Sequence, residues 1–479
     1  MKKILVLVLF FCIGFLAACD EKIGPDEEPI IEEPVIDPNY DRLFDDNNEK
    51  SFTIEITSTE LNKLDQYMIE YRNQFGDYKT DAVVEAKLKY EDEQGVIDVE
   101  NIAFRARGNT SRNRLINDNG DLNPSSYKVY FDKAVYAQKG SVLHTFINDR
   151  TVFGLTELNF KFNRNYESTY ITEKFSYDLF NDFGVFAPKI THAKLYLKID
   201  NKTNYLGIFN VVESIDQSFL TKRFKNEDQG NLYKVLWQQF GPASLEKNYP
   251  SGAIGIKDES IHYFPSYDLK TNKKTNDTSD IVTLISMLND LEGSYFKTFI
   301  EANFDVDRLL RLLAVGVLLG NPDDYRAMGN NYYLYRNNVS GKWVMIPYDY
   351  DHGLGQGWDG SPVFTNYSIG MDIYTWGNLN SHIVGHEIKH PLTDKILEIP
   401  EYQLRYEGYL NDLIETGLFT KEAYFDTYLT VKELYEDNVY QALWVIPFGT
   451  RNIEGYITGK TEDILNQLEY YQNNPSKRP

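Results

Sequence analysis

Carboxylate and amide side chains gather in two short segments of the chain that have the residue types needed for phosphate chemistry. The first is a polar loop that contributes Asp323, Asp324, Asn330 and Asn331, and the second is a turn that contributes Asp349 and Asp351. Oxygen ligands of this kind bind Mg²⁺, and a carboxylate among them can orient or deprotonate an acceptor hydroxyl. The pattern indicates phosphoryl transfer; the alternative interpretation is a solvated loop and a charged turn without chemistry.

Regular elements must hold these two segments in place. The spacing of Leu, Val and Ala predicts a buried helix over 306–319 that ends at Gly320. Two aromatic and β-branched runs, 332–336 and 343–347, predict a hairpin between the loop and the turn. Protein kinases use the same succession of helix, Asp/Asn loop, hairpin and Asp-x-Gly turn. The loop departs from the kinase pattern, because no His-Arg precedes the Asp and more than four residues separate it from the Asn.

Length and composition bound the remaining function classes. A chain of 479 residues can bury a large core and is expected to form two lobes or domains. Its formal net charge of -22 argues against a nucleic-acid partner, which requires clustered Lys and Arg. The chain has no CxxC, HExxH, GxSxG or Walker-type motif, so zinc, serine-hydrolase and P-loop functions lose their strongest signals.

The first residues predict that the protein is exported as a lipoprotein. Two lysines precede an apolar run, 4–16, and Leu16-Ala17-Ala18-Cys19 resembles a bacterial lipobox. We expect a signal peptide over 1–19, with Cys19 as the lipidated residue that anchors the protein to a membrane outside the cytoplasm; an ordinary signal peptide cut near Ala18 is the alternative. Residues 20–50 are rich in Asp, Glu and Pro, which predicts a disordered acidic tether.

The remaining chain divides into a strand-rich part, 51–240, a polar and irregular hinge or insertion, 241–279, and a helix-rich part, 280–479. This distribution predicts an α+β fold with two lobes. In the strand-rich part, Arg105 and Arg107 precede the small-residue turn 108–111. Such a turn either binds an anion or is a tight surface turn with exposed arginines.

Several phrases occur together in one order: FRARGNTSR (104–112), SYKVYFDK (126–133), YLGIFNVVESID (205–216) and NNYYLYRNNVSGKWVMIPYDYDHGLG (330–355). With them the chain resembles the CotH family of spore coat protein H-like atypical kinases over roughly 54–413. The resemblance implies a bilobal, diverged protein-kinase-like fold with a strand-rich N-lobe and a helix-rich C-lobe. It also implies ATP and Mg²⁺ or Mn²⁺ as cofactors and a protein Ser or Thr as acceptor.

The resemblance also assigns roles to individual residues. In the C-lobe, Asp323 matches the catalytic base and is preferred over its neighbour Asp324, which adds a second carboxylate to the loop. Asp349 and Asp351 match the family's paired Asp, at least one of which should hold metal, and Asn331 is the expected further ligand. In the N-lobe, the nucleotide candidates are Arg107, Asn109, Lys128 and, as partner of a lysine, Glu213.

Three hypotheses follow from these residues. The first is a membrane-tethered extracytoplasmic kinase that acts on a protein of unknown identity, as a monomer and without a nucleic-acid partner. The second is a non-catalytic surface binding or adhesion module on a kinase-like scaffold. In the third, Asp349 and Asp351 hold a structural Ca²⁺ ion. Binding of nucleotide together with metal distinguishes the first hypothesis from the other two.

Overall fold

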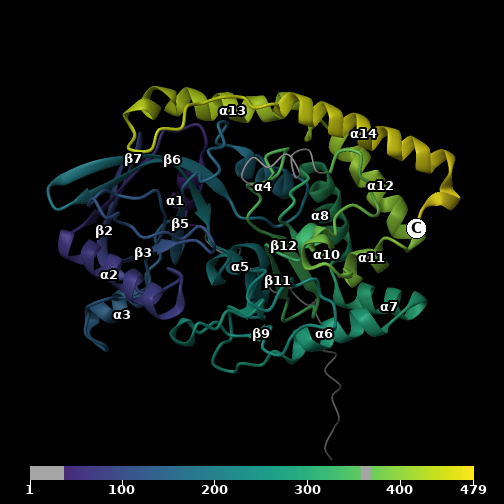
Figure 1. The fold of residues 1–479 in the computed structure, drawn as a ribbon, viewed down its shortest axis with the longest axis horizontal. Helices are drawn as coiled ribbons and strands as arrows, with labels where there is room; N and C mark the ends of the chain where they lie inside the picture. The colour runs from purple at the N-terminus through teal and green to yellow at the C-terminus, as the bar shows by residue number, and fades with distance from the viewer. Residues whose placement is uncertain (1–36, 358–367) are drawn as a thin grey trace, which may run out of the picture. The chain divides into compact units, whose positions relative to one another are not determined.

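Strands from the first half of the chain close into a β-barrel in the order β1-β2-β3-β4-β5-β7-β6 (Figure 1). They are β1 (Ser51–Ile56), β2 (Val84–Asp92), β3 (Gly95–Arg107), β4 (Ser126–Tyr130), β5 (Glu157–Lys161), β6 (Ile190–Ile199) and β7 (Lys202–Glu213). Neighbouring strands are antiparallel except β1 and β6, whose parallel pairing completes the barrel. Alternate residues of β1 and β2 are buried, so one face of each strand packs into the core.

This computed structural model describes residues 37–357 and 368–479, which belong to one compact unit. Cys19 and the predicted signal peptide lie outside the described residues. The predicted end of the tether at residue 50 is wrong, because α1 (Pro38–Phe44) is a helix with Tyr40, Leu43 and Phe44 buried. Three apolar side chains on one short helix outweigh the acidic composition of the surrounding segment.

A second sheet has the strand order β12-β11-β8-β10-β9. Its strands are β8 (Leu232–Val235), β9 (Ile254–Gly255), β10 (Tyr267–Leu269), β11 (Tyr332–Arg336) and β12 (Trp343–Pro347). The predicted hairpin β11–β12 is present, but β8 pairs with β11 across about one hundred residues of sequence. The predicted hinge 241–279 therefore contains two strands of a sheet that joins both halves of the chain, which corrects the predicted boundaries.

Helices dominate the second half, as predicted, and the fold class is α+β. They are α6 (Ser279–Asp290), α7 (Gly293–Asn303), α8 (Val306–Leu319), α9 (Tyr325–Met328), α10 (Leu379–Val384), α11 (Pro391–Ile396), α12 (Pro400–Glu415), α13 (Lys421–Tyr435) and α14 (Ile453–Asn473). The first half contributes α2 (Ser58–Phe75), α3 (Val142–Asn148), α4 (Thr172–Asp182) and α5 (Gln217–Phe224). The central helix α8 begins at the cap Asp305 and ends at Gly320, whose φ of 56° is left-handed.

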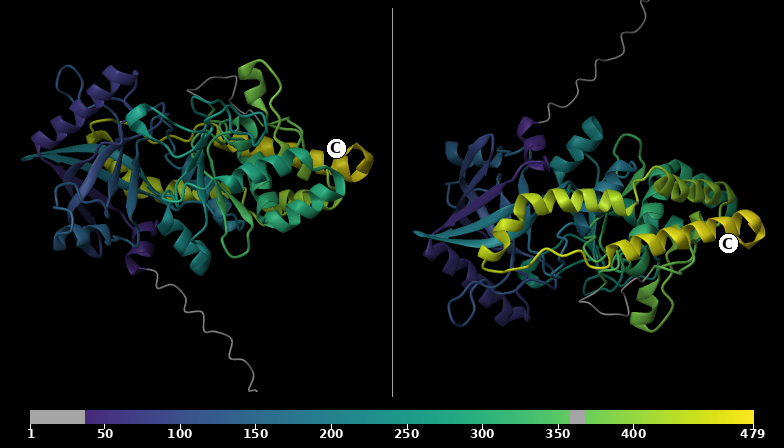
Figure 2. Two further views of the ribbon diagram at one scale, coloured as in Figure 1. Left: turned by 90° about the horizontal axis from the view of Figure 1, so that it is seen from below. Right: turned by 90° about the horizontal axis from the view of Figure 1, so that it is seen from above.

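The C-terminal segment returns to the barrel. Helix α13 crosses β6 and β7, and α14 continues over the helical half (Figures 1 and 2). Tyr435 donates its hydroxyl to the carbonyl of His192 in β6 at 2.8 Å, and the backbone N–H of Leu443 donates to Tyr205 in β7 at 2.8 Å. The predicted helical lobe 280–479 thus includes residues that pack on the barrel. Among the described residues, no helix has both the length and the apolar character needed to cross a membrane.

Candidate active site

A cavity of about 1160 Å³ lies between the barrel and the second sheet. The ends of β3, β4 and β5 line one side, and β8, the loop after α8 and the exit of β12 line the other. Lysines and arginines outnumber carboxylates among its described lining residues, whereas the whole chain is strongly acidic. A basic cavity in an acidic protein concentrates anionic ligands.

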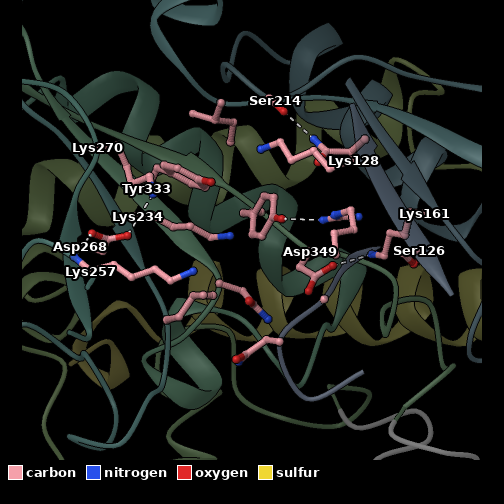
Figure 3. Close-up of a pocket in the computed structure, with 18 of the residues that line it drawn as sticks. Ser126, Lys128, Lys161, Ser214, Lys234, Lys257, Asp268, Lys270, Tyr333 and Asp349 are labelled. Atoms are coloured by element: carbon pink, nitrogen blue, oxygen red, sulfur yellow. Dashed lines mark hydrogen bonds and ion pairs between the residues drawn. The ribbon is translucent and has the colours of Figure 1, made fainter. Parts of the chain in front are cut away.

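Lys161 is a cation of the cavity that the sequence analysis missed. It stands at the end of β5, and its Nζ lies 2.9 Å from both carboxylate oxygens of Glu173 in α4. The same nitrogen contacts Asp349 at 2.5 Å (Figure 3). It also contacts Asp351 at 3.1 Å. A strand ending in Lys, followed by a helix with Glu in its first turn, was the signal available in the sequence.

The opposite charges of Lys161 and its carboxylate partners stabilise each other's ionised forms. Burial lowers the pKa of Lys161, but attraction to Asp349, Asp351 and Glu173 outweighs burial and leaves the pKa above its usual range. Burial raises the pKa of Asp349, but Lys161 outweighs it and brings the value to about 2. Lys161 is therefore an ammonium and Asp349 a carboxylate at neutral pH.

The predicted base Asp323 lies on the cavity in a loop that begins directly after Gly320. Asn330 donates to its Oδ1 at 2.8 Å and Asn331 donates to its Oδ2 at 2.9 Å, so two side-chain amides fix the carboxyl group. Asn331 has a φ of 51°, a left-handed conformation that Asn tolerates better than most residues. Burial raises the pKa of Asp323 to about 7, the range suited to a general base.

The second predicted catalytic residue, Asp324, has a structural role. Its side chain is 3% exposed and caps α9 by accepting the backbone N–H of Ala327 at 2.8 Å. Tyr350 also donates its hydroxyl to this carboxylate at 3.2 Å. Asp324 is not among the described residues that line the cavity, and the prediction of a catalytic role for it is corrected.

Asp349 and Asp351 both face the cavity, as the predicted metal ligands should. Among the described residues, Asp351 Oδ1 is buried without a hydrogen-bond partner, and His352 Nε2 lies 3.5 Å from it. No group of three or more Asp, Glu, His or Cys in the described ranges is arranged to hold a metal by itself. Two carboxylates facing an open cavity fit Mg²⁺ or Mn²⁺, which take further ligands from phosphates and water.

The side-chain amide of Asn331 donates to the backbone carbonyl of Asp323 at 2.9 Å as well as to its carboxylate. Its assignment as a further metal ligand stays a prediction.

The predicted nucleotide residues of the barrel also line the cavity. Arg107 donates to the hydroxyl of Tyr348 at 3.0 Å, Asn109 accepts from Gln238 at 3.4 Å, and Lys128 pairs with Glu157. Gly108, with a φ of 131°, allows the turn between Arg107 and Asn109. Arg107 and Asn109 thus connect the barrel to the exit of β12 and to the segment after β8.

Glu213 does not belong to this group. Its fully buried carboxylate pairs with Arg223 at 2.6 Å, accepts the hydroxyl of Tyr40 at 2.9 Å and accepts the backbone N–H of Lys189 at 3.0 Å. It is not one of the described residues that line the cavity. The predicted role of Glu213 as a nucleotide-site partner is corrected, and Glu173 is the glutamate that pairs with Lys161.

The protein thus has an α+β fold, and its cavity contains two groups of side chains. In one, Lys161 contacts Glu173, Asp349 and Asp351. In the other, Asn330 and Asn331 hold the carboxyl group of Asp323. The chain belongs to the CotH kinase protein family, whose model matches residues 104–477, and the predicted membership is confirmed. Inner spore coat protein H of Bacillus subtilis (strain 168) is 27% identical over 286 residues, which are 60% of this chain and 69% of the relative.

A solved structure of the Helicobacter pylori proinflammatory kinase CtkA is also similar to this chain. The match has a TM-score of 0.27 and 14% sequence identity, and covers 67% of this chain and 92% of that chain.

Proposed function

We propose that this protein is a kinase that transfers the γ-phosphate of ATP to a Ser or Thr hydroxyl of a protein, with Mg²⁺ or Mn²⁺ as cofactor. The observation that carries the proposal is the position of Lys161, which contacts Glu173, Asp349 and Asp351 in the cavity that also holds Asp323. Protein kinases use a strand lysine, a helix glutamate, a loop aspartate and a metal-binding aspartate for this chemistry.

The order of elements supports a bilobal, diverged kinase-like architecture. Lys161 ends β5 and Glu173 opens α4, while α8, the Asp323 loop, the β11–β12 hairpin and the Asp349 turn follow in that order. In this proposal the barrel is the N-lobe and the segment from α6 onward supplies most of the C-lobe. The second sheet joins the two lobes, with the cavity between them.

In the reaction, Asp323 accepts the proton of the acceptor hydroxyl while Asn330 and Asn331 hold its carboxylate in position. The acceptor oxygen forms a bond to the γ-phosphorus, and the bond from that phosphorus to the β,γ-bridging oxygen breaks, so that ADP leaves. Lys161 and Arg107 neutralise phosphate charge. A divalent cation at Asp349 and Asp351 would neutralise the phosphate oxygens further when bound.

A transfer assay tests this function directly. Full-length protein in mild detergent is incubated with radiolabelled ATP, Mg²⁺ and a generic protein acceptor, beside Asp351→Asn. A matched control is Asp412→Asn, on an exposed position of α12 outside the cavity. We expect Asp351→Asn to lower incorporation by at least about 100-fold and the control to retain it. Equal incorporation by all three proteins would refute the assignment.

Calorimetric titration separates the kinase from the binding module. The kinase proposal requires that ATP with Mg²⁺ binds the wild-type protein; failure to bind would favour a surface binding module. The proposed location outside the cytoplasm rests on the leader 1–19 and on lipidation of Cys19. Incorporation of labelled palmitate in the bacterial cell, and its loss in Cys19→Ala, is the corresponding test.

A further inference from the structure

Lysines dominate the side of the cavity opposite Lys161. Lys234 lies in β8, Lys257 follows β9, Lys270 directly follows β10, and Lys273 lies in the next turn; we call these four residues the lysine wall. Figure 3 shows Lys234, Lys257 and Lys270 on one side of the cavity and Lys161 with Asp349 on the other. The lysine wall is built by the second sheet, whereas Lys161 belongs to the barrel.

The lysine wall has more positive charge than its own carboxylates neutralise. Lys257 pairs with Asp81 at 2.5 Å, but Arg105 shares the same carboxylate at 3.3 Å. Lys270 pairs with Asp268 at 3.1 Å. Within the described part of the chain, Lys234 and Lys273 have no carboxylate partner, and Lys234 Nζ faces the ring of Tyr348 at 4.5 Å.

Two lysines of the lysine wall have lowered pKa values, chiefly because they are buried and in part because other cations lie nearby. Burial, opposed by Asp81 and reinforced by Arg105, lowers the pKa of Lys257 to about 8. Burial and the neighbouring Lys270 also lower the pKa of Lys273. An anionic ligand would relieve both effects, because it supplies the missing negative charge in a partly buried site.

The lysine wall extends from Tyr348, which Arg107 also contacts, towards the base. Trp237, in the segment that continues from Lys234, donates its backbone N–H to Asn330 Oδ1 at 2.6 Å. Asn330 in turn donates to Asp323 at 2.8 Å. The acceptor hydroxyl must reach Asp323, so the residues that flank this hydroxyl pass along the side on which the lysine wall stands.

We propose that the lysine wall binds acidic residues that flank the acceptor hydroxyl, so that the preferred acceptor is a Ser or Thr within a Glu- or Asp-rich peptide segment. This inference rests on the proposed kinase function. Pockets for one small ligand usually have volumes of about 300–1,000 Å³. The cavity, at about 1160 Å³, exceeds this range and can take part of a peptide beside a nucleotide. The Lys161 cluster takes the nucleotide phosphates and leaves the lysine wall to the acceptor.

Three peptides of equal length test the proposal, each with a single Ser flanked by Glu, Gln or Lys. Wild-type full-length protein should prefer the Glu peptide over the Gln peptide in kcat/KM and should use the Lys peptide least. In the double variant Lys270→Gln/Lys273→Gln, the ratio of Glu to Gln peptide should fall about tenfold, chiefly through KM. Lys247→Gln removes an exposed lysine that pairs with Asp290 outside the cavity and should retain the wild-type ratio.

Equal kcat/KM for the three peptides, or an unchanged ratio in the double variant, overturns the inference. A rise in the KM for ATP without a change in the ratio also overturns it, because the lysine wall would then be a nucleotide site. Fluorescence anisotropy of a labelled Glu peptide without nucleotide separates this inference from the proposed function. If the wild-type protein binds the Glu peptide but transfers no phosphate, and the double variant does not bind it, the acidic-peptide site is supported and the kinase is refuted. If the wild-type protein does not bind the peptide, the site is overturned.

Discussion

At the scale of single residues, the site depends on how a few carboxyl groups are held. Lys161 keeps Asp349 ionised, whereas burial outweighs the attraction of His352 and raises the pKa of Asp323. Two neighbouring aspartates in one loop also differ, because Asp323 faces the cavity and Asp324 caps a helix. The environment therefore gives side chains of one type different protonation behaviour and, at Asp324, a structural role.

Alanine substitution of the two neighbours tests this division. Asp323→Ala should lower kcat by about 10³-fold, because the acceptor hydroxyl loses its base, while binding of ATP with Mg²⁺ is retained. Asp324→Ala should instead lower the free energy of unfolding by about 1–2 kcal/mol, because the cap of α9 is lost. Steady-state kinetics and urea unfolding measure the two effects, and a larger loss of kcat in Asp324→Ala would contradict the assignment.

At the scale of elements, the sequence predicted those whose signal is local. The helix 306–319 was predicted with its observed bounds, because a 3.6-residue apolar period and a left-handed Gly are both readable in one stretch. The β11–β12 hairpin was also predicted, because its two strands and the turn between them are adjacent in the sequence. Asp323, Asp349 and Asp351 share a cavity as the predicted order of these elements requires.

Elements defined by distant partners were missed. Strands β9 and β10 have two and three residues, too short to show a period, and they were interpreted as a hinge. The contact between Lys161 and Asp349 joins positions 188 apart and depends on closure of the barrel against the second sheet. Glu213 was chosen because it ends a strand, whereas Glu173 lies in the first turn of a helix and only packing brings it to Lys161.

Arg451 links helix α4, which carries Glu173, to the turn that carries Asp349 and Asp351. Its guanidinium donates to Glu167 at 3.1 Å, to the hydroxyl of Thr172 at the start of α4 at 3.1 Å, and to the carbonyl of Leu354 at 3.4 Å. Thr172 precedes Glu173, and Leu354 follows the turn that contains Asp351. The C-terminal segment thereby connects α4 to the turn that contains Asp351.

Arg451→Met should therefore lower kcat by about tenfold and the free energy of unfolding by about 2 kcal/mol, since it leaves the carboxylate of Glu167 buried without its cation. Arg451→Lys should recover part of both losses. Arg405→Met is the matched control, because Arg405 pairs with Asp307 on a more exposed surface, where an ion pair contributes about 1 kcal/mol or less. A loss of stability without loss of kcat in the folded protein would rule out a positioning role for Arg451.

At the scale of the whole molecule, the C-terminal helices join the barrel to the helical half. Tyr435 in α13 reaches the backbone of His192 in β6, and α14 packs against α12 and α13. The imidazole of His192 lies beneath this contact and is 2% exposed. Its Nε2 lies 2.9 Å from the carbonyl of Tyr170, and its Nδ1 is buried without a hydrogen-bond partner among the described residues. A proton added to this ring has no acceptor there.

Stability should accordingly fall in acid. Burial lowers the pKa of His192 to about 4, below the ordinary 6.5, so the unfolded chain binds a proton there that the folded protein does not. The contribution of His192 is complete above pH 6.5 and declines by about 1.4 kcal/mol per pH unit down to pH 4. Urea unfolding across this range should show a shallower decline in His192→Gln than in wild type. The exposed control His386→Gln should follow wild type; parallel curves for His192→Gln and wild type would show that the buried ring is not the acid-sensitive group.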